Sequence, residues 1–246
     1  MQDSLLKNPF VFATLICVVC SAALSLCASG LRPIQERNQQ IYQHRNILLA
    51  VGIPSDPDTE DISAEQVEQI FEEKMKKVTI DAEGNPVEAP AEASAESEDE
   101  NPEVYQLYEF QEDGEVKAYV LPMTGQGLWG PISGYLALEP DCNTIKGVTF
   151  FTKMETPGLG AEISNPPFES QFPGKHVFDK DGNLVSINVV KGKAEEVAPK
   201  QIDHSVDGVS GATITSNGVQ AMLLDWLTRY EPYFKKVKEQ HRKEAA

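Results

Sequence analysis

The sequence lacks the features of several common protein classes. Only 4 of its 246 residues are cysteines, and their spacing indicates neither a disulfide framework nor a zinc site. It contains no Walker lysine motif and no internal repeat, which argues against a doubly wound nucleotide-binding domain. The 4 histidines have no evident catalytic partners, so we expect neither a catalytic triad nor a metal site.

The chain also lacks a basic cluster of useful size. Its net charge is −17, and residues 56–103 hold 17 acidic residues against 3 lysines, so most of the negative charge lies in one stretch. Because binding to a phosphate backbone needs a basic face, nucleic acid is not expected as a partner. Within this stretch, residues 82–103 consist mainly of Ala, Glu, Ser and Pro and predict an acidic low-complexity loop.

A long apolar run follows an N-terminal tail of residues 1–8. From Pro9 to Leu31 the chain has 23 residues without a charged side chain. At about 1.5 Å per residue this run is long enough to cross a hydrocarbon core of roughly 30 Å. It predicts one transmembrane helix; a cleaved signal peptide is the alternative, although its apolar region is usually shorter. Three of the cysteines lie here and are interpreted as small apolar membrane residues.

Residues 32–81 predict a helical membrane-proximal segment. A helix is expected to continue out of the membrane to Ala50, where Gly52-Ile53-Pro54 breaks it. Ser63 and Gln66 have the spacing of a capping box, which predicts a second helix. Its expected apolar stripe consists of Val67, Ile70, Phe71, Met75 and Val78.

Residues 104–246 predict an α+β domain with a mostly antiparallel sheet and packed helices, preceded by the one transmembrane helix. Two hairpins and one further strand are expected, with strands at 104–110, 116–121, 135–138, 145–152 and 184–190. A final amphipathic helix is expected to begin near Ser216. Its buried side is predicted to carry Val219, Met222, Leu223, Trp226, Leu227 and Tyr230.

The stretch Asp207–Gly218, just before this helix, is rich in small and hydroxyl-bearing residues. Its glycines allow close backbone approach, and Ser216 or Asn217 can cap the helix. Successive N–H groups at a helix start form a site that suits a phosphate. An ordinary turn before a helix is the alternative.

Two further segments, Gly125–Gly134 and Glu155–Gly160, are rich in glycine. Glycine at this density beside Trp129 or Leu159 suits a surface against which a flat ligand lies, with peptide N–H groups free to meet its oxygens. Tight turns between strands explain the same composition equally well.

Taken together, the three stretches resemble a known family. Residues 207–213, Asp-x-x-Ser-Gly-Ala-Thr, resemble the motif at which a flavin transferase attaches FMN through its phosphate. The segment Glu155–Gly160 resembles the ETPGLG loop of the same FMN-binding domain, and Gly125–Gly134 resembles its GLWG-type loop. The order of these parts, with an LRP-Gln junction at Leu31–Gln35, is similar to that of the C subunit of the sodium-translocating NADH:quinone oxidoreductase. The related G subunit of the Rnf complex shares the flavin domain, but chain length and the junction favour the C subunit.

The resemblance implies that Thr213 carries covalent FMN and that the transferase requires Asp207, with Ser210, Gly211 and Ala212 forming the turn. Thr215 lies two residues on and does not end the motif. Other residues implied near the flavin are Glu155, Thr156, Gly158, Leu159, Gly160, Trp129 and Lys153. Lys153 stands where the family often has histidine, so a fixed cation would replace a titratable group if it contacts the flavin.

By this resemblance the chain relays electrons in a Na+-pumping NADH:ubiquinone reductase and has no catalytic centre beyond its flavin. Its expected partners are the other subunits of the complex and, for maturation, a flavin transferase. It is expected in the bacterial inner membrane as a single-pass protein with a periplasmic C-terminal domain. The charges beside the apolar run, Lys7 before it and Arg32, Arg37 and Arg45 after it, favour a cytoplasmic domain instead. A membrane-anchored module for a soluble phosphate ligand and a purely structural assembly subunit are the competing hypotheses.

Overall fold

The computed structural model describes residues 9–54, 62–87 and 104–244. These residues belong to two compact units, one ending at Gln43 and the other beginning at His44. The predicted tail 1–8 and residues 88–103 of the predicted acidic loop lie outside the described residues.

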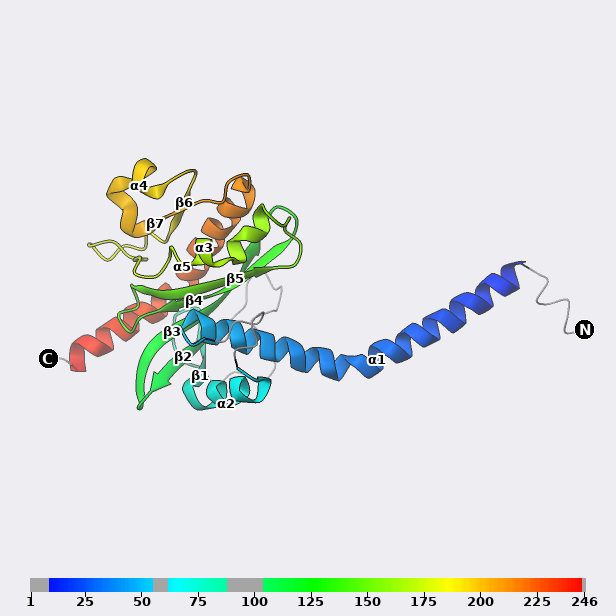
Figure 1. The fold of residues 1–246 in the computed structure, drawn as a ribbon. Helices are drawn as coiled ribbons and strands as arrows, with labels where there is room; N and C mark the ends of the chain where they lie inside the picture. The colour runs from blue at the N-terminus through cyan, green and yellow to red at the C-terminus, as the bar shows by residue number, and fades with distance from the viewer. Residues whose placement is uncertain (1–8, 55–61, 88–103, 245–246) are drawn as a thin grey trace, which may run out of the picture. The chain divides into compact units, whose positions relative to one another are not determined.

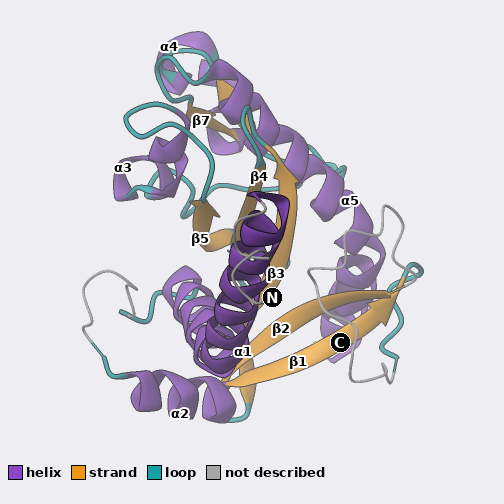
Figure 2. Cartoon of the chain, turned by 90° about the vertical axis from the view of Figure 1, so that its right-hand side faces the viewer, coloured by secondary structure: helices purple, strands orange, loops and turns teal. Residues whose placement is uncertain are grey.

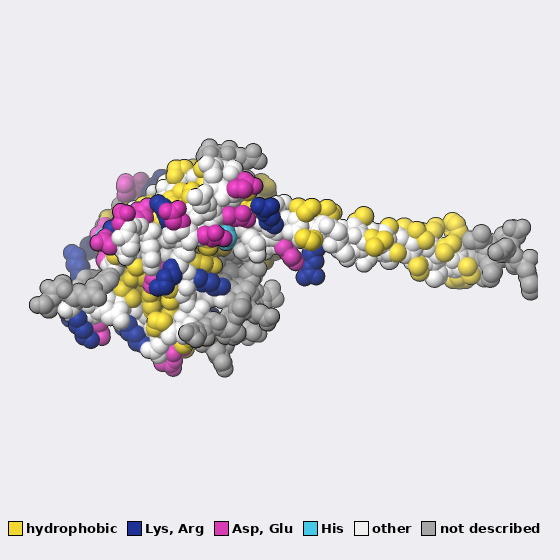
Figure 3. All heavy atoms as spheres, turned by 90° about the horizontal axis from the view of Figure 1, so that it is seen from below, with side chains coloured by type: hydrophobic (Ala, Val, Ile, Leu, Met, Phe, Trp, Pro, Cys, Tyr) yellow, Lys and Arg dark blue, Asp and Glu magenta, His cyan; other side chains and the backbone are white. Residues whose placement is uncertain are grey.

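The first helix, α1 (Pro9–Ala50), has 42 residues and contains Pro33. Hydrophobic side chains lie along its N-terminal part on the face seen in Figure 3, and none of its most apolar 18-residue stretch, with a mean hydropathy of 2.5, is buried. The helix is therefore long and apolar enough to cross a membrane. It ends at the predicted break: the N–H of Gly52, whose φ is 89°, donates to the Leu49 carbonyl, and the Ile53 N–H donates to the Leu48 carbonyl. These two bonds are those of a Schellman cap.

The capping box is confirmed, but the helix that it begins is shorter than predicted. In α2 (Ala64–Lys74) the Gln66 N–H donates to the Ser63 hydroxyl at 3.3 Å, and the Ser63 N–H donates to the Gln66 side chain at 2.9 Å. Residues 75–81, predicted as helical, form strand β1 (Met75–Asp81) instead. The β-branched run from Val78 to Ile80 suits a strand, and pairing with a neighbouring strand supplies backbone hydrogen bonds that the local helical spacing could not anticipate.

The central sheet has five antiparallel strands in sequence order, with α2 and β1 at one side of it in Figure 2. After β1 come β2 (Val104–Glu112), β3 (Glu115–Gln126), β4 (Pro131–Leu138) and β5 (Ile145–Thr152). Both predicted hairpins are therefore confirmed. The first turns at Asp113-Gly114, whose φ values of 54° and 79° are those that a tight hairpin turn requires.

The segment after β5 contains short elements and one small sheet. They are η2 (Gly160–Ser164), α3 (Pro166–Glu169), β6 (Asn188–Val190), α4 (Ala194–Val197), η3 (Pro199–His204) and β7 (Ser205–Asp207). β6 and β7 pair in parallel. The strand predicted from Leu184 is shorter, because Ser186 has a φ of 58°, which interrupts the extended chain; Leu184 forms only an isolated bridge with Phe178.

The last helix, α5 (Thr213–Glu244), lies along β3 of the sheet (Figures 1 and 2). The predicted apolar side of this helix is confirmed: five of its six residues are buried, and Trp226 is partly buried. The Tyr230 hydroxyl donates to the Gln106 carbonyl at 2.7 Å, and the Trp226 indole donates to the Thr124 carbonyl at 2.7 Å. The α+β architecture with a mostly antiparallel sheet is thus confirmed, and α5 fixes the end of β3 beside its own first turns.

Candidate functional site

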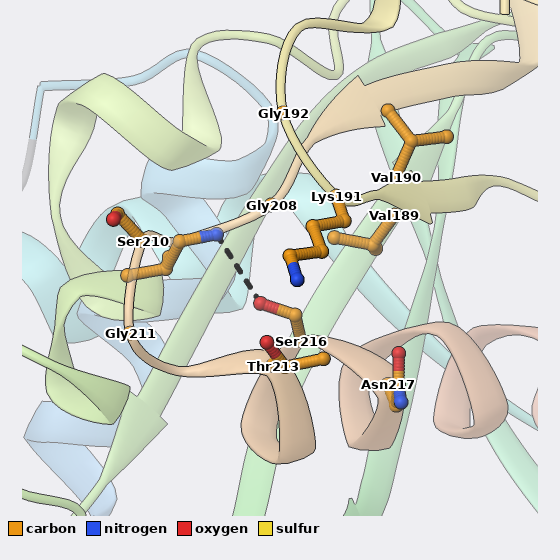
Figure 4. A pocket seen from close by; sticks show the side chains of 11 residues that line it. Val189, Val190, Lys191, Gly192, Gly208, Ser210, Gly211, Thr213, Ser216 and Asn217 are labelled. Atoms are coloured by element: carbon orange, nitrogen blue, oxygen red, sulfur yellow. Dashed lines mark hydrogen bonds between the residues drawn. The ribbon is translucent and has the colours of Figure 1, made fainter. Parts of the chain in front are cut away.

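The motif 207–213 connects the end of β7 to the first residue of α5. The prediction that Ser216 or Asn217 caps the helix is wrong, because the helix begins at Thr213, where the Ala212 carbonyl accepts the first helical bond from the Ser216 N–H at 2.9 Å. The Ser216 hydroxyl instead accepts from the Val209 N–H at 3.2 Å (Figure 4). Ser216 therefore ties the motif loop to the first turn of α5.

Thr213 and Thr215 have opposite environments. Thr213 is exposed, whereas Thr215 is only 1% exposed and donates its hydroxyl hydrogen to Glu155 Oε2 at 2.7 Å. Two helical positions differ by about 200° around the axis, so the two side chains leave α5 on different sides. Thr213 consequently has the accessible hydroxyl, while that of Thr215 is used inside the protein.

Glu155 joins the three glycine-rich segments. It is 7% exposed; besides the bond from Thr215, its Oε1 accepts the backbone N–H of Trp129 at 2.8 Å. A side chain at Gly160 would collide with Glu155 Oε2, and one at Gly218 would collide with the Gln126 carbonyl. These glycines therefore allow the segments to meet, which composition suggested only as a general property of glycine.

A cavity of about 270 Å³ opens beside Thr213. Figure 4 shows the Lys191 side chain extending into it from the segment after β6, with Thr213, Ser216 and Asn217 on the α5 side. Gly208, Ser210 and Gly211 of the motif also line it. Sequence reasoning missed Lys191; its position next to Gly192, directly after a strand, was the available signal.

Asp207 points away from this cavity. Its carboxylate accepts the Ala194 N–H at 2.7 Å and pairs with Lys193 Nζ at 2.6 Å. Partial burial would by itself raise the pKa of Asp207, but the Ala194 N–H and the Lys193 ammonium outweigh it and lower that pKa below its usual value. Asp207 is therefore a charged carboxylate held within its own domain.

Exposed apolar side chains come from the same segments. They are Leu128 and Trp129 from the turn after β3, Met154 and Leu159 from the turn after β5, and Ile214 from α5. Trp129, whose own backbone N–H donates to Glu155, has a side chain that is 62% exposed. Ile214, between Thr213 and Thr215, is 58% exposed. Such side chains offer an apolar surface to a flat ligand.

The remaining predicted site residues lie in the turn between β5 and η2. Lys153, Thr156 and Gly158 are exposed, and the Gly158 N–H donates to Glu162 Oε1 at 3.0 Å. The structure therefore brings the ETPGLG segment to the motif through Glu155, while it leaves any contact of Lys153 with a flavin as a prediction. Among residues 9–54, 62–87 and 104–244, no cluster of three or more His, Cys, Asp or Glu side chains could hold a metal ion.

Comparison with known proteins identifies similar chains. The FMN-binding domain family matches residues 127–228. The C subunit of the Na+-translocating NADH-quinone reductase of Yersinia pestis is 33% identical over 97% of this chain and 95% of its own length, and that of Vibrio alginolyticus is 35% identical over 90% and 91%. The crystal structure of the same subunit from Parabacteroides distasonis superimposes with a TM-score of 0.72 at 35% identity, covering 83% of this chain and 96% of that one.

Proposed function

The chain belongs to the family formed by the C subunits of Na+-translocating NADH-quinone reductases, and we propose that it is the membrane-anchored flavoprotein subunit of such a complex. In this proposal FMN is attached through its phosphate to Thr213, and the subunit relays electrons between other redox centres of the complex. Membership of this family favours the proposed function over that of an Rnf G subunit. The reductase activity belongs to the complex, and the flavin is the redox group that this chain contributes.

The exposure of Thr213 at the start of α5 is the observation that carries the proposal. The first N–H groups of a helix lack intrahelical acceptors, and the helix dipole adds positive potential there, so this end of α5 suits a phosphate. The Lys191 ammonium adds a positive charge on the facing wall of the cavity. The residues present therefore fit a phosphoester at Thr213 Oγ1, and the buried Thr215 does not.

Attachment of FMN requires an activated donor and a flavin transferase. With a flavin dinucleotide as donor, the bond between Thr213 Oγ1 and phosphorus forms as the pyrophosphate bond breaks. A nucleoside monophosphate leaves, the hydroxyl proton passes to a base of the transferase, and no electrons are transferred. The chain itself supplies an accessible hydroxyl and compensates the phosphate charge.

When bound, FMN supplies reversible electron exchange. A phosphoester holds it permanently while leaving its ring to be tuned only by non-covalent contacts. The exposed side chains of Trp129, Leu159 and Ile214 would contact a flat ring, and Glu155 would hold together the three segments that carry them. Lys153 would contribute a fixed positive charge if the ring reaches the turn after β5.

The apolar part of α1 is proposed to anchor the subunit in the bacterial inner membrane, with the C-terminal domain in the periplasm and the other subunits as partners. The charges flanking the apolar run favour the opposite orientation. Protease digestion of intact spheroplasts distinguishes the two: a periplasmic domain is cleaved before lysis, and a cytoplasmic domain only after it.

Intact-mass analysis of the purified chain and of three threonine variants tests the attachment. We expect one FMN residue on the wild type and on Thr213→Ser, none on Thr213→Val, and an unchanged adduct on the control Thr228→Ala, whose exposed hydroxyl donates to the Leu224 carbonyl in α5. Ultraviolet fluorescence of the denatured band separates covalent from released flavin. A Thr213→Val chain that keeps both the adduct and quinone reduction would refute the proposal.

The competing hypotheses give different results in the same experiment. A module for a soluble phosphate ligand loses the ligand on denaturation and leaves a wild-type band without fluorescence. A purely structural assembly subunit supports quinone reduction equally well with Thr213→Val.

A further inference from the structure

The position of Asp207 indicates a role different from the one its place in the attachment motif suggests. Thr213 lines the cavity beside α5, whereas Asp207 lines a second cavity of about 440 Å³ together with Lys175, Lys193 and Ser205. Only 23% of the Asp207 side chain is exposed, and both of its oxygens already have donors within the domain. A transferase approaching Thr213 would therefore find this carboxylate occupied.

The donors to Asp207 directly follow the segment that lines the Thr213 cavity. Residues 189–192 line that cavity, and Lys193 and Ala194, which bind the carboxylate, follow them directly in the chain. On the other side of Asp207, the Gly208 N–H donates to the Val190 carbonyl at 2.7 Å. Asp207 thus joins the motif strand to the segment that carries Lys191.

We propose that Asp207 is a positioning residue, whose carboxylate holds residues 191–194 so that Lys191 faces the threonine to which FMN is attached. This inference rests on the proposed function of Thr213. It assigns the requirement for the motif aspartate to the shape of the acceptor site rather than to direct contact with the transferase.

The carboxylate bonds matter most for residues 191–193, which are exposed, since Ala194 is buried and the Val190 carbonyl already accepts the Gly208 N–H. β6 and β7 contribute only three residues each, and Lys191, Gly192 and Lys193 are exposed. Gly192 has a φ of 99°, which other residues rarely adopt, and because glycine has no side chain its backbone can reorient once the carboxylate bonds are lost. Besides Lys193 and Asp207, the second cavity is lined by Lys175 and Glu195, whose charges have opposite signs. Neither side chain takes over the bonds that the Asp207 carboxylate accepts from Lys193 and Ala194.

Transfer of FMN to the full-length chain in detergent, with purified transferase and a flavin dinucleotide, tests the proposal. The variants are Asp207→Ala, Lys193→Met, their combination, and the control Lys200→Met, which removes an exposed positive charge in η3. We expect Asp207→Ala to lower kcat about 10-fold to 100-fold, because two charge-assisted bonds are lost. Lys193→Met should lower it about 2-fold to 5-fold, since an exposed ion pair contributes less.

The combined variant distinguishes positioning of residues 191–194 by the carboxylate from direct recognition of the carboxylate by the transferase. If Asp207 acts through Lys193 and Ala194, the double variant has the kcat of Asp207→Ala within about twofold, because the partners act as one unit. Amide hydrogen exchange in residues 189–197 should rise in Asp207→Ala and Lys193→Met, and stay unchanged in Lys200→Met.

Direct recognition gives a different pattern, which would overturn the proposal: Asp207→Ala raises KM for the acceptor chain at unchanged kcat, while Lys193→Met behaves like Lys200→Met. If Asp207→Ala does not fold, Lys193→Met and Asp207→Asn take its place: a kcat below that of Lys200→Met supports the positioning role, and an equal kcat contradicts it. A wild-type chain that accepts no FMN at Thr213 contradicts the proposed function itself. A wild type that accepts FMN, with Lys193→Met equal to Lys200→Met, contradicts only the role of Asp207.

Discussion

Replacement of Glu155 tests whether one carboxylate joins the three glycine-rich segments. Glu155→Gln keeps an acceptor for the Trp129 N–H, and its amide can donate to the Thr215 hydroxyl oxygen, so two charge-assisted bonds become neutral ones. We expect the free energy of unfolding to fall by about 1 kcal/mol. Glu155→Ala removes both acceptors and leaves the donors unpaired, so the expected loss is about 2–4 kcal/mol.

Urea unfolding of the detergent-solubilised chain measures these differences. Trp226 reports on the packing of α5, and a Trp129→Phe background removes the other of the 2 tryptophans. Glu162→Ala is the matched control, because Glu162 lies close in the chain but its partners, the Gly158 N–H and the Asn165 amide, are exposed. A loss for Glu155→Ala within about 0.5 kcal/mol of that for Glu162→Ala would refute the role of Glu155.

A double-mutant cycle isolates the bond between Glu155 and Thr215. Thr215→Val removes the donor while keeping the shape of the side chain, and we expect it to cost about 1–3 kcal/mol, because a buried carboxylate oxygen loses its donor. The effects of Glu155→Ala and Thr215→Val should then be non-additive, since both remove the same bond. Additive losses would show that the two side chains act independently.

Two further predictions concern packing and thiol chemistry. Gly218→Ala should destabilise the C-terminal domain by about 1–3 kcal/mol in urea unfolding, because its methyl group would collide with the Gln126 carbonyl. The control is Gly30→Ala in α1, which has no atom within 4 Å of the added carbon and should leave the free energy of unfolding of that domain unchanged. Burial raises the pKa of the Cys142 thiol to about 12, so in a chain lacking the other three cysteines a maleimide should label Cys142 at pH 8 only after unfolding. Rapid labelling of the native chain would contradict this burial.

Much of the secondary structure follows from local sequence rules. The capping box at Ser63, the break at Gly52 and the hairpin turn at Asp113-Gly114 each depend on residues within a few positions of one another. The apolar side of α5 follows from helical periodicity in the same way. These features were therefore predictable from the chain alone.

The errors in the prediction fall where a distant partner or a single backbone angle decides the structure. Met75 and Val78 fit a helical stripe, yet they belong to β1 because β2 supplies their backbone partners. Ser186 shortens a strand by adopting a positive φ, which its side chain does not announce. At Thr213 the helix begins three residues before the expected cap, because the Ala212 carbonyl is already in position to accept a helical bond.

By itself, the sequence determined the α+β class, the apolar helix and, through a motif resemblance, the threonine proposed to carry FMN. Only the tertiary structure decided that Thr215 is used by Glu155, 60 residues away, that Lys191 faces Thr213, and that Asp207 faces a different cavity. The reason is physical: turns, caps and periodicity act over a few residues. The direction of a side chain at a site depends instead on which distant segments pack against it, and no local rule contains that information.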